Sequence, residues 1–321
     1  MKDIINSGEV NELIFREFVK NGFARNDGHK SWDVAKRRFL YLTPEQANSF
    51  LNLKSFDVYK KQIIEREIKL IHEHGKNIAE NIGGEPFNLI DIFCGDGTKA
   101  CEIIKLFPKN VKIRYCPVNA SKYLIDIAIS NVKAANLPNV IEFKPMLAQG
   151  DGQTLRYLDS NLKGGRFKRN VVIILGTVLA SFQITEYLFE MSKDMSVEDF
   201  LIIGNGIRMG KRLVELGKYR APQLGNWSIH LVSGLGLRDD EVEYDVRFGN
   251  SRVEMFFRIL VDKTIKHDGK TLEFKKGDEI LTMVLYKYYA KEFDKFCKMY
   301  FSNVNLWTDK DNGYALVMCN K

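Results

Sequence analysis

The segment of residues 87–105, FNLIDIFCGDGTKACEIIK, constrains the fold of this chain more than any other stretch. An apolar run ends in a glycine turn at residues 94–97, and apolar residues at helical spacing follow at Ala100, Ile103 and Ile104. A strand, a glycine turn and a helix in that order form a unit that cradles nucleotides. The glycines permit close backbone approach, and the free N–H groups of the helix start face the ligand. We therefore expect a nucleotide-like ligand at this turn.

The segments around this unit alternate between helical patterns and apolar runs. A long helix is expected at residues 57–81, because isoleucines recur there at helical spacing and Gly83 follows. Strands are expected at residues 89–93, 112–118, 140–144, 170–175 and 200–203, and helices at residues 123–135 and 184–195. Strands that alternate with helices predict an α/β fold with a parallel, doubly wound sheet.

The two ends of the chain follow other patterns. Residues 1–55 read as broken helices, with one stretch at residues 32–40 and a helix start at Thr43, Pro44 and Gln46. The threonine and glutamine match a capping box, and the proline suits the first helical position. After residue 205 the pattern predicts a helical insertion and then antiparallel strands, at residues 213–235, 252–261, 272–274, 280–288 and 314–318.

These patterns predict a division of the chain into domains. Residues 57–206 form a Rossmann-like nucleotide-binding domain, to which residues 289–321 return. Residues 1–56, a helical segment, and residues 207–288, a helical and then β-rich insertion, form a smaller mixed α+β domain for the substrate.

Composition narrows the class of protein. No run of about 18 apolar residues is present, so no membrane span is expected. The five cysteines are an odd number and widely scattered, which indicates neither a disulfide framework nor a metal site, and favours a cytoplasmic setting. The net charge of +7 is spread along the chain, and its densest stretch, residues 163–169, reads as a connecting loop.

The glycine spacing favours S-adenosylmethionine over a dinucleotide. A dinucleotide fold wants G-x-G-x-x-G, whereas this chain offers only Gly95-x-Gly97, with Phe93 where an earlier glycine is usual. Asp91, near the strand end, can reach the methionine ammonium, and the glycine backbone can accommodate the ribose and carboxylate. A turn that only joins strand to helix is the alternative.

Two further positions bear on the same ligand. Asn119 follows the second strand, where an acid usually holds the ribose hydroxyls; its amide can still accept a hydrogen bond, without charge assistance. Asp151 stands where an acid often meets the adenine amino group, although it could equally be a turn residue.

Motifs along the chain resemble those of one family. The segments GDGTK, PVNAS, LGTVLASF, VEM, ILTMVLYKY and LWTD occur in the family's order at residues 95–99, 117–121, 175–182, 253–255, 280–288 and 306–309. The chain thus resembles the histidine-specific, S-adenosylmethionine-dependent Nα-methyltransferases of ergothioneine biosynthesis and their fungal relatives that methylate tryptophan derivatives.

The resemblance implies a Rossmann-like class I methyltransferase fold and a set of ligand contacts. The cofactor contacts that it implies, together with those read from the turn, are Asp91, Phe93, Gly95, Asp96, Gly97, Lys99, Asn119, Ser121, Asp151, Gly176 and Thr177. The implied substrate contacts are Tyr41, Tyr59, Ser181, Tyr219, Met255, Met283 and Leu285.

Departures from the family pattern concern the substrate. Met283 and Leu285 stand where the family has a glutamate and a serine that grip the imidazole of histidine, and Ser181 replaces an asparagine that contacts the substrate's amino-acid end. An imidazole left unpaired loses about 1–3 kcal/mol per unsatisfied group. We therefore expect an acceptor other than histidine.

The expected reaction is in-line transfer of a methyl group to the nitrogen of an amino acid or related small amine, accelerated mainly by proximity. No dedicated general base is evident; Tyr41 and Tyr59 are the catalytic candidates, and a tyrosine or water could accept the amine proton. Two alternatives remain open at this stage. One is a methyltransferase for a protein or RNA, and the other is a cofactor-binding scaffold or subunit with little or no catalysis.

Overall fold

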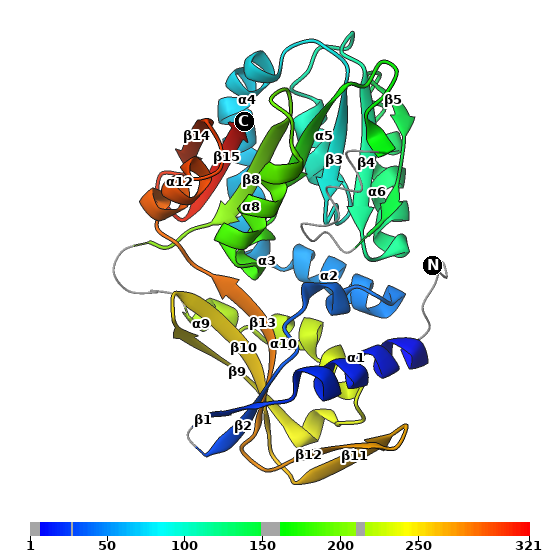
Figure 1. The fold of residues 1–321 in the computed structure, drawn as a ribbon, viewed down its shortest axis with the longest axis vertical. Coiled ribbons are helices and arrows are strands. Elements are labelled where there is room, and N and C mark those ends of the chain that lie inside the picture. The colour runs from blue at the N-terminus through cyan, green and yellow to red at the C-terminus, as the bar shows by residue number, and fades with distance from the viewer. Residues whose placement is uncertain (1–6, 27, 149–160, 210–215) are drawn as a thin grey trace. The chain divides into compact units, whose positions relative to one another are not determined.

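The computed structural model describes residues 7–26, 28–148, 161–209 and 216–321. The chain divides into two compact units. The larger unit contains residues 57–212 and 287–321, and the smaller unit contains residues 1–56 and 213–286. Figure 1 labels many of the elements of both units along the chain.

The larger unit is built on an eight-stranded sheet. Its strands are β3 (Phe87–Ile92), β4 (Ile113–Asn119), β5 (Val140–Phe143), β6 (Met146–Leu147), β7 (Arg169–Ile174), β8 (Phe200–Gly206), β14 (Asn303–Thr308) and β15 (Tyr314–Asn320). They lie in the order β14-β15-β8-β7-β3-β4-β5, and β6 pairs with β4. Strands β3, β4, β5, β7 and β8 are parallel, whereas β15 is antiparallel to β8 and β14 is antiparallel to β15.

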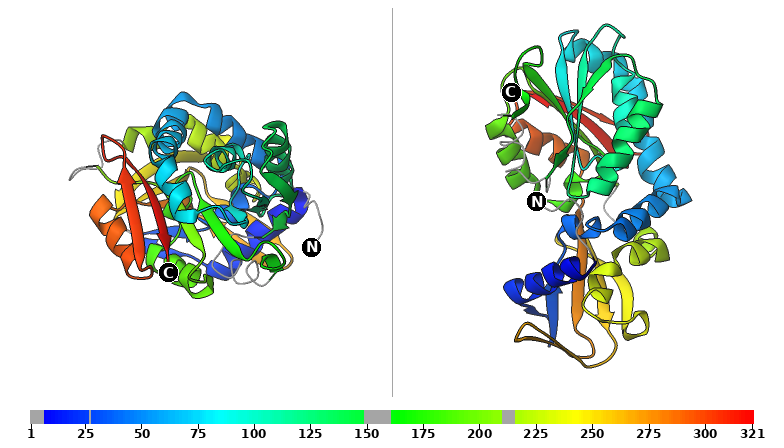
Figure 2. Two further views of the ribbon diagram at one scale, coloured as in Figure 1. Left: turned by 90° about the horizontal axis from the view of Figure 1, so that it is seen from above. Right: turned by 90° about the vertical axis from the view of Figure 1, so that its right-hand side faces the viewer.

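This order has a topological switch point between β3 and β7. The chain runs outward from β3 to β4 and β5 on one side, and then returns to β7 and β8 on the other. Ligands of open α/β sheets bind beyond the carboxyl ends of the strands at such a point. The predicted α/β, doubly wound, Rossmann-like architecture is therefore confirmed, and Figure 2 shows the twist of this sheet in two further views.

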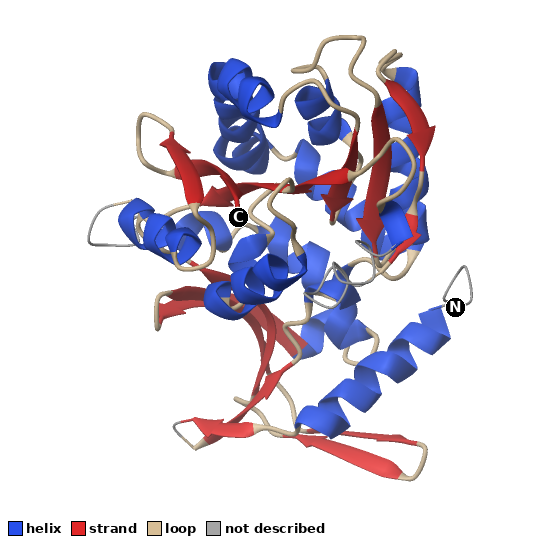
Figure 3. Cartoon of the chain, turned by 45° about the horizontal axis from the view of Figure 1, so that its top comes forward, coloured by secondary structure: helices blue, strands red, loops and turns tan. Residues whose placement is uncertain are grey.

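Helices cover both faces of the sheet (Figure 3). One face packs against α4 (Glu65–Ile82), α5 (Thr98–Ile104) and α6 (Lys122–Ala134), through an apolar cluster that includes Ile71, Ile103 and Val132. The other packs against α8 (Ile184–Asp194) and α12 (Ala290–Lys298), through a cluster that includes Met191 and Phe293. The sheet is thus buried on both sides, as its near-continuous apolar strands indicate.

The helix expected at residues 57–81 is present, with one irregular turn. It consists of α3 (Asp57–Tyr59), a π-helical turn at Lys60–Ile64 and α4, which ends at Gly83 with φ of 76°. The buried stripe of α4 contains a charged residue, Glu67, among its apolar members. The capped helix start is also confirmed, because Thr43 and Gln46 form the capping box of α2 (Pro44–Ser55).

The smaller unit contains a five-stranded sheet in the order β1-β2-β13-β10-β9. Its strands are β1 (Ala24–Asn26), β2 (His29–Asp33), β9 (Val242–Gly249), β10 (Arg252–Ile259) and β13 (Glu279–Tyr286). A separate hairpin is formed by β11 (Lys263–His267) and β12 (Lys270–Phe274). Its helices are α1 (Ser7–Asn21), α2, α9 (Leu216–Tyr219), α10 (Pro222–Ser228) and α11 (His230–Ser233), with short 3-10 turns at Arg37–Leu40 and Asp239–Glu241.

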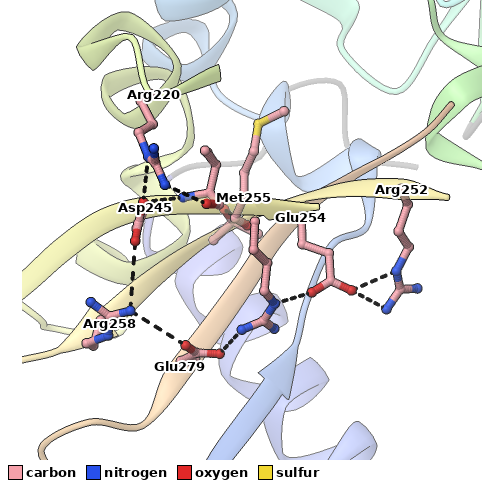
Figure 4. A network of polar contacts seen from close by, with 10 residues as sticks. Arg220, Asp245, Arg252, Glu254, Met255, Arg258 and Glu279 are labelled. Carbon is pink, nitrogen blue, oxygen red and sulfur yellow. Dashed lines mark hydrogen bonds and ion pairs between the residues drawn. The ribbon is translucent and has the colours of Figure 1, made fainter. Parts of the chain in front are cut away.

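One face of this sheet carries a ladder of alternating charges (Figure 4). Glu254 accepts hydrogen bonds from Arg247 at 2.6 Å and from Arg252 at 2.7 Å. Arg247 also forms an ion pair with Glu279. Glu279 in turn forms an ion pair with Arg258, at a distance of 4.0 Å between Oε1 and Nη2. The ladder is continuous across strands β9, β10 and β13, and its arginines are about a third exposed.

Some expectations about local structure were wrong. The segment expected to be helical from residue 32 begins instead in the hairpin β1–β2. This hairpin belongs to the five-stranded sheet of the smaller unit, because β2 pairs in parallel with β13. This long-range pairing is invisible in a local pattern. Phe93 lies outside β3, because its φ of 57° ends the extended backbone. Strands β9, β11 and β14 and helix α12 were not foreseen.

The basic stretch at residues 163–169 is a connecting segment, as expected. Lys163 pairs with Asp199, and Arg169 donates to the backbone carbonyls of Ile82 and Glu85. Among the described residues no helix is long and apolar enough to cross a membrane. Within the same ranges no group of three or more His, Cys, Asp and Glu side chains could hold a metal ion.

Candidate cofactor site

The turn after β3 is held in a conformation that only some residues accept. Phe93, Gly95 and Gly97 have φ of 57°, 55° and 74°, a region that glycine enters freely and other residues rarely. A Cβ on Gly97 would lie 2.8 Å from the backbone oxygen of Ala128 on α6. Gly97 is therefore needed both for its conformation and for the close approach of α5 to α6.

Asp96 fastens this turn to its surroundings. Its Oδ1 accepts from the backbone N–H of Thr98 at 3.2 Å, and its carbonyl accepts from the side chain of Asn131 at 2.9 Å. The backbone N–H of Cys94 donates to the carbonyl of Val118 at the end of β4, at 3.2 Å. The turn is thus braced from α6 and from the neighbouring strand.

Asp91 places a buried acid near the carboxyl end of β3. The residue is 5% exposed, and its Oδ2 accepts from the hydroxyl of Tyr115 at 2.8 Å. Burial raises the pKa of Asp91 to about 7, although the bond from Tyr115 and the charge of Lys99 oppose that rise. Because burial disfavours the charged form of this carboxyl, a cation beside it would draw it into that form.

A second strained turn follows β7, the neighbour of β3 across the switch point. Gly176 and Thr177 both have positive φ, 81° and 64°. The N–H of Thr177 donates to Gly204 at 3.1 Å, and its Oγ1 accepts from the N–H of Gly206 at 3.2 Å. Positive φ at a non-glycine residue persists only where its surroundings hold it, and such strain gathers at functional sites.

A fully buried carboxylate, that of Glu67 on α4, joins the elements around these turns. Its Oε1 accepts from the N–H of Gly176 at 2.8 Å and from the hydroxyl of Tyr314 at 2.6 Å. Its Oε2 forms an ion pair with the ammonium of Lys99, on the first turn of α5. One side chain thus connects α4, α5, the turn after β7 and the start of β15.

Two glycines make room for this ion pair on the sheet. A Cβ on Gly204, in β8, would lie 1.7 Å from Oε1 of Glu67. A Cβ on Gly176 would lie 2.7 Å from Nζ of Lys99. A side chain at either position would have to displace the end of Glu67 or of Lys99, so the two glycines leave the space that the pair occupies.

Asn119 and Ser121 lie at the carboxyl end of β4. Asn119 is 2% exposed, and its Oδ1 accepts from the backbone N–H of Ser121 at 3.0 Å. Ser121 caps α6 by accepting from the N–H of Leu124 at 3.4 Å. Both therefore have local structural partners at the edge where a ribose contact was expected. Asp151 lies outside the described residues.

In the smaller unit, the structure brings together three expected substrate residues. Met255 on β10 lies directly opposite Met283 on β13, and Leu285 lies opposite Val253. Figure 4 shows the side chain of Met255 on the opposite side of the strand from Glu254. Met255 and Met283 are buried and Leu285 is half-buried, so this face of the strand pair is apolar.

The remaining expected substrate residues are dispersed over the chain. Tyr41 is buried and packs against Phe50 and Trp227, with ring centroids 5.2 and 5.7 Å away. The carbonyl of Tyr219 accepts from the hydroxyl of Tyr244 at 2.8 Å. In the larger unit, Tyr59 precedes the π-helical turn and Ser181 lies in the 3-10 turn Leu179–Ser181; both are partly exposed.

Comparison with known proteins decides the family. The model of the histidine-specific, S-adenosylmethionine-dependent methyltransferases matches residues 58–216 and 234–321. The chain belongs to this family. As a member of it, the protein is a methyltransferase whose cofactor is S-adenosylmethionine. A search of the curated proteins gave no match.

Solved structures include several methyltransferases at low identity. An S-adenosylmethionine-dependent methyltransferase from Clostridium acetobutylicum matches at 14% identity and a TM-score of 0.45, over 85% of this chain and 98% of that one. PH0226 from Pyrococcus horikoshii matches at 14% and 0.45, over 86% and 98%. The sugar N-methyltransferase KedS8 from a Streptoalloteichus species matches at 11% and 0.41, over 85% and 92%. At these values the matches carry no argument about function.

Reasoning from the sequence missed three residues of this methyltransferase that the structure places beside the two turns: Glu67, Tyr115 and Tyr314. A signal existed for Glu67, since it falls three residues after Ile64 and four before Ile71, on the apolar stripe of its helix. Tyr115 and Tyr314 sit within apolar strands and look like ordinary core residues. Only the fold brings their hydroxyls to Asp91 and Glu67.

Proposed function

We propose that this protein transfers the methyl group of S-adenosylmethionine to the nitrogen of an amino acid or related small amine other than histidine. The observation that carries the proposal is the apolar pair Met255 and Met283 on neighbouring strands. The family resemblance puts a glutamate for the imidazole where Met283 stands. A methionine offers that ring no hydrogen bond, so a histidine side chain would stay unpaired.

The groups at the carboxyl ends of the strands suit this cofactor. We assign Asp91 to its ammonium, because a buried acid with a pKa of about 7 ionises readily beside a cation. Lys99 is assigned to its carboxylate, and Asn119 with Ser121 to its ribose. The turns formed by Phe93, Gly95, Asp96 and Gly97, and by Gly176 and Thr177, supply backbone groups around it.

When bound, the cofactor supplies an activated methyl group on a sulfonium. The protein's contribution is to hold the acceptor nitrogen in line with that methyl group and to exclude water, which requires no covalent intermediate with the chain. The acceptor amine must first lose its proton. Tyr41 and Tyr59 are the side chains to which we assign contact with the amine, with water or a tyrosine accepting the proton. The family resemblance implies that Met255, Met283 and Leu285 contact the acceptor's apolar part, and that Ser181 and Tyr219 contact its polar end.

A macromolecular acceptor has less support. Residues 163–169 are the densest basic stretch of the chain, and two of their cations bind partners within the protein. Lys163 pairs with Asp199, and Arg169 donates to backbone carbonyls. A nucleic-acid surface needs cations that are free to meet phosphates. This observation favours a small acceptor over RNA.

The test is a transfer assay with methyl-labelled cofactor. The native chain is incubated with a pool of amino acids and small amines, with histidine alone, and with cell protein and RNA fractions. We expect label in nitrogen of pool members other than histidine. Label only in protein or RNA, or faster transfer to histidine than to every other pool member, would overturn the proposal.

A paired substitution tests the substrate wall itself. Restoring the polar pair with Met283→Glu and Leu285→Ser should install histidine methylation, with a gain of at least tenfold over the native rate. The matched control is Met255→Leu, a volume-conserving change on the opposite strand that adds no polar group. A folded double variant that binds cofactor yet leaves histidine unmethylated would show that this strand does not contact the acceptor's side chain.

A further inference from the structure

Glu67 lies beside both turns of the cofactor site, although it belongs to none of the turn motifs. Its side chain is 0% exposed, and its ion-pair partner Lys99 is 15% exposed. The helix that carries it, α4, precedes the first strand of the sheet. A carboxylate buried to this degree is costly unless a partner or a ligand makes use of its charge.

The hydrogen bonds of Glu67 do not by themselves require a charge. Its Oε1 accepts from the N–H of Gly176 and from the hydroxyl of Tyr314. The amide oxygen of a glutamine could accept both. What a glutamine could not do is neutralise the ammonium of Lys99. The negative charge of Glu67 therefore acts on Lys99, and through it on any ligand group that Lys99 contacts.

The charges of Glu67 and Lys99 act on the carboxyl of Asp91, near the carboxyl end of β3. Lys99 lowers the pKa of Asp91, and Glu67 together with Asp96 raises it, in each case less than burial does. The pair is thus within electrostatic reach of the carboxyl that we assign to the cofactor's ammonium.

We infer that Glu67 sets the charge of the site so that it favours S-adenosylmethionine over the demethylated product. The cofactor carries a carboxylate, an ammonium and a sulfonium and is a net cation. The product, a thioether, has lost the sulfonium charge and is neutral. Because Glu67 cancels the charge of Lys99, the cationic cofactor meets no uncompensated positive charge there. Glu67 acts through Lys99 and is a positioning residue, and the inference rests on the proposed place of Lys99 at the cofactor.

The experiment measures the affinities of S-adenosylmethionine and S-adenosylhomocysteine by calorimetry, for the native chain and for charge variants. In Glu67→Gln, Lys99 is an unpaired cation, and we expect the preference for the cationic cofactor to fall about tenfold relative to the product. In Lys99→Met the unpaired charge is negative, and the preference should shift the opposite way. In the double variant both charges are gone, and the ratio should return close to the native value.

Arg66→Gln is the matched control. Arg66 neighbours Glu67 on α4 and pairs with Asp309, so the variant also removes an ion pair from this helix, but not the pair to Lys99. Its affinity ratio should stay native. Equal weakening of both ligands in Glu67→Gln would indicate a purely structural role and would overturn the inference. If Glu67→Gln does not fold, Lys99→Met and the double variant decide, because an unchanged ratio in Lys99→Met also overturns it. If the native chain binds neither ligand, the cofactor assignment itself fails.

Discussion

The two units of this methyltransferase use ion pairs in opposite ways. In the larger unit, Glu67 and Lys99 form one pair with a fully buried carboxylate, and glycines at 176 and 204 leave it room. In the smaller unit, Glu254 is buried as well, but the arginines that it binds in the ladder are about a third exposed. The first pair lies beside strained turns, whereas the second braces strands that already pair along their backbones.

This difference has an energetic meaning. Exposed ion pairs contribute about 0–1 kcal/mol each, because water screens them and ordering the side chains costs entropy. A buried pair hardly adds net stability over an apolar replacement, yet removing one partner costs about 3–5 kcal/mol. The ladder can therefore be altered piecemeal, while the buried pair must be kept whole.

The largest expected effect follows from removal of Glu67. Glu67→Ala leaves Lys99 without its partner, empties a buried volume and frees the N–H of Gly176. We expect the free energy of unfolding to fall by about 3–5 kcal/mol, measured by urea denaturation. Glu254→Ala in the ladder is the comparison, and we expect a smaller loss there, because its arginine partners reach solvent. An equal or greater loss at Glu254 would contradict the contrast between the two units.

The next effect concerns the room that the sheet leaves for the pair. Gly204→Ala places a methyl group within 1.7 Å of the Glu67 carboxylate, which must move and release Gly176. Overpacking of this kind costs about 1–3 kcal/mol, and we expect weaker cofactor binding as well. The control is Gly249→Ala at the end of β9, where a Cβ meets nothing within 4 Å. Thermal unfolding and calorimetry on both variants check the prediction, which fails if Gly204→Ala behaves like Gly249→Ala.

A moderate effect is expected from pH. The pKa of Asp91 is raised to about 7 by burial, so its contribution to stability is fully present below pH 3.8 and is lost as the pH rises through 7. Cofactor affinity should change with pH in the opposite direction, because the cofactor's ammonium binds the ionised carboxylate of Asp91. Affinity should fall by up to tenfold for each pH unit below about 7, and calorimetry between pH 5.5 and 8 checks this.

The variant Asp91→Asn tests whether the pH dependence of cofactor affinity comes from Asp91. The variant should bind the cofactor weakly and with little dependence on pH over the same range. A native chain whose affinity is flat between pH 5.5 and 8 would show that Asp91 does not meet the ammonium.

The smallest effect lies in the ladder. Arg252→Gln removes one of the arginines that Glu254 binds and leaves Arg247 in place. The free energy of unfolding should fall by less than about 1 kcal/mol, and the difference should shrink in high salt because the pair is partly exposed. A loss of several kcal/mol, unchanged by salt, would place the ladder in the same class as the buried pair.

The sequence predicts the larger unit better than the smaller one. Strands β3, β4, β7 and β8 are predominantly apolar runs with turn residues a few positions beyond their ends, and such runs can be recognised without a structure. The hairpin β1–β2 is not, because β2 is a strand by virtue of its parallel pairing with β13, about 250 residues further along the chain.

The same limit applies to the site. The glycine turn at residues 95–97 is visible because its conformation restricts residue type. The partnership of Glu67 with Lys99, Gly176 and Tyr314 is not, since it joins α4, α5, the turn after β7 and the start of β15. The only sign of this partnership in the sequence is that Glu67, a charged residue, falls on the apolar stripe of its helix.

The central claim is that the two turns and the buried pair between α4 and α5 form the S-adenosylmethionine site. Its most direct test is a calorimetric titration of the native, Gly204→Ala and Gly249→Ala chains with S-adenosylmethionine at pH 7.5. The account predicts one site per native chain with sub-millimolar affinity, clear weakening in Gly204→Ala and native affinity in Gly249→Ala. Absence of binding to the native chain at millimolar cofactor, or equal binding by all three chains, would contradict it.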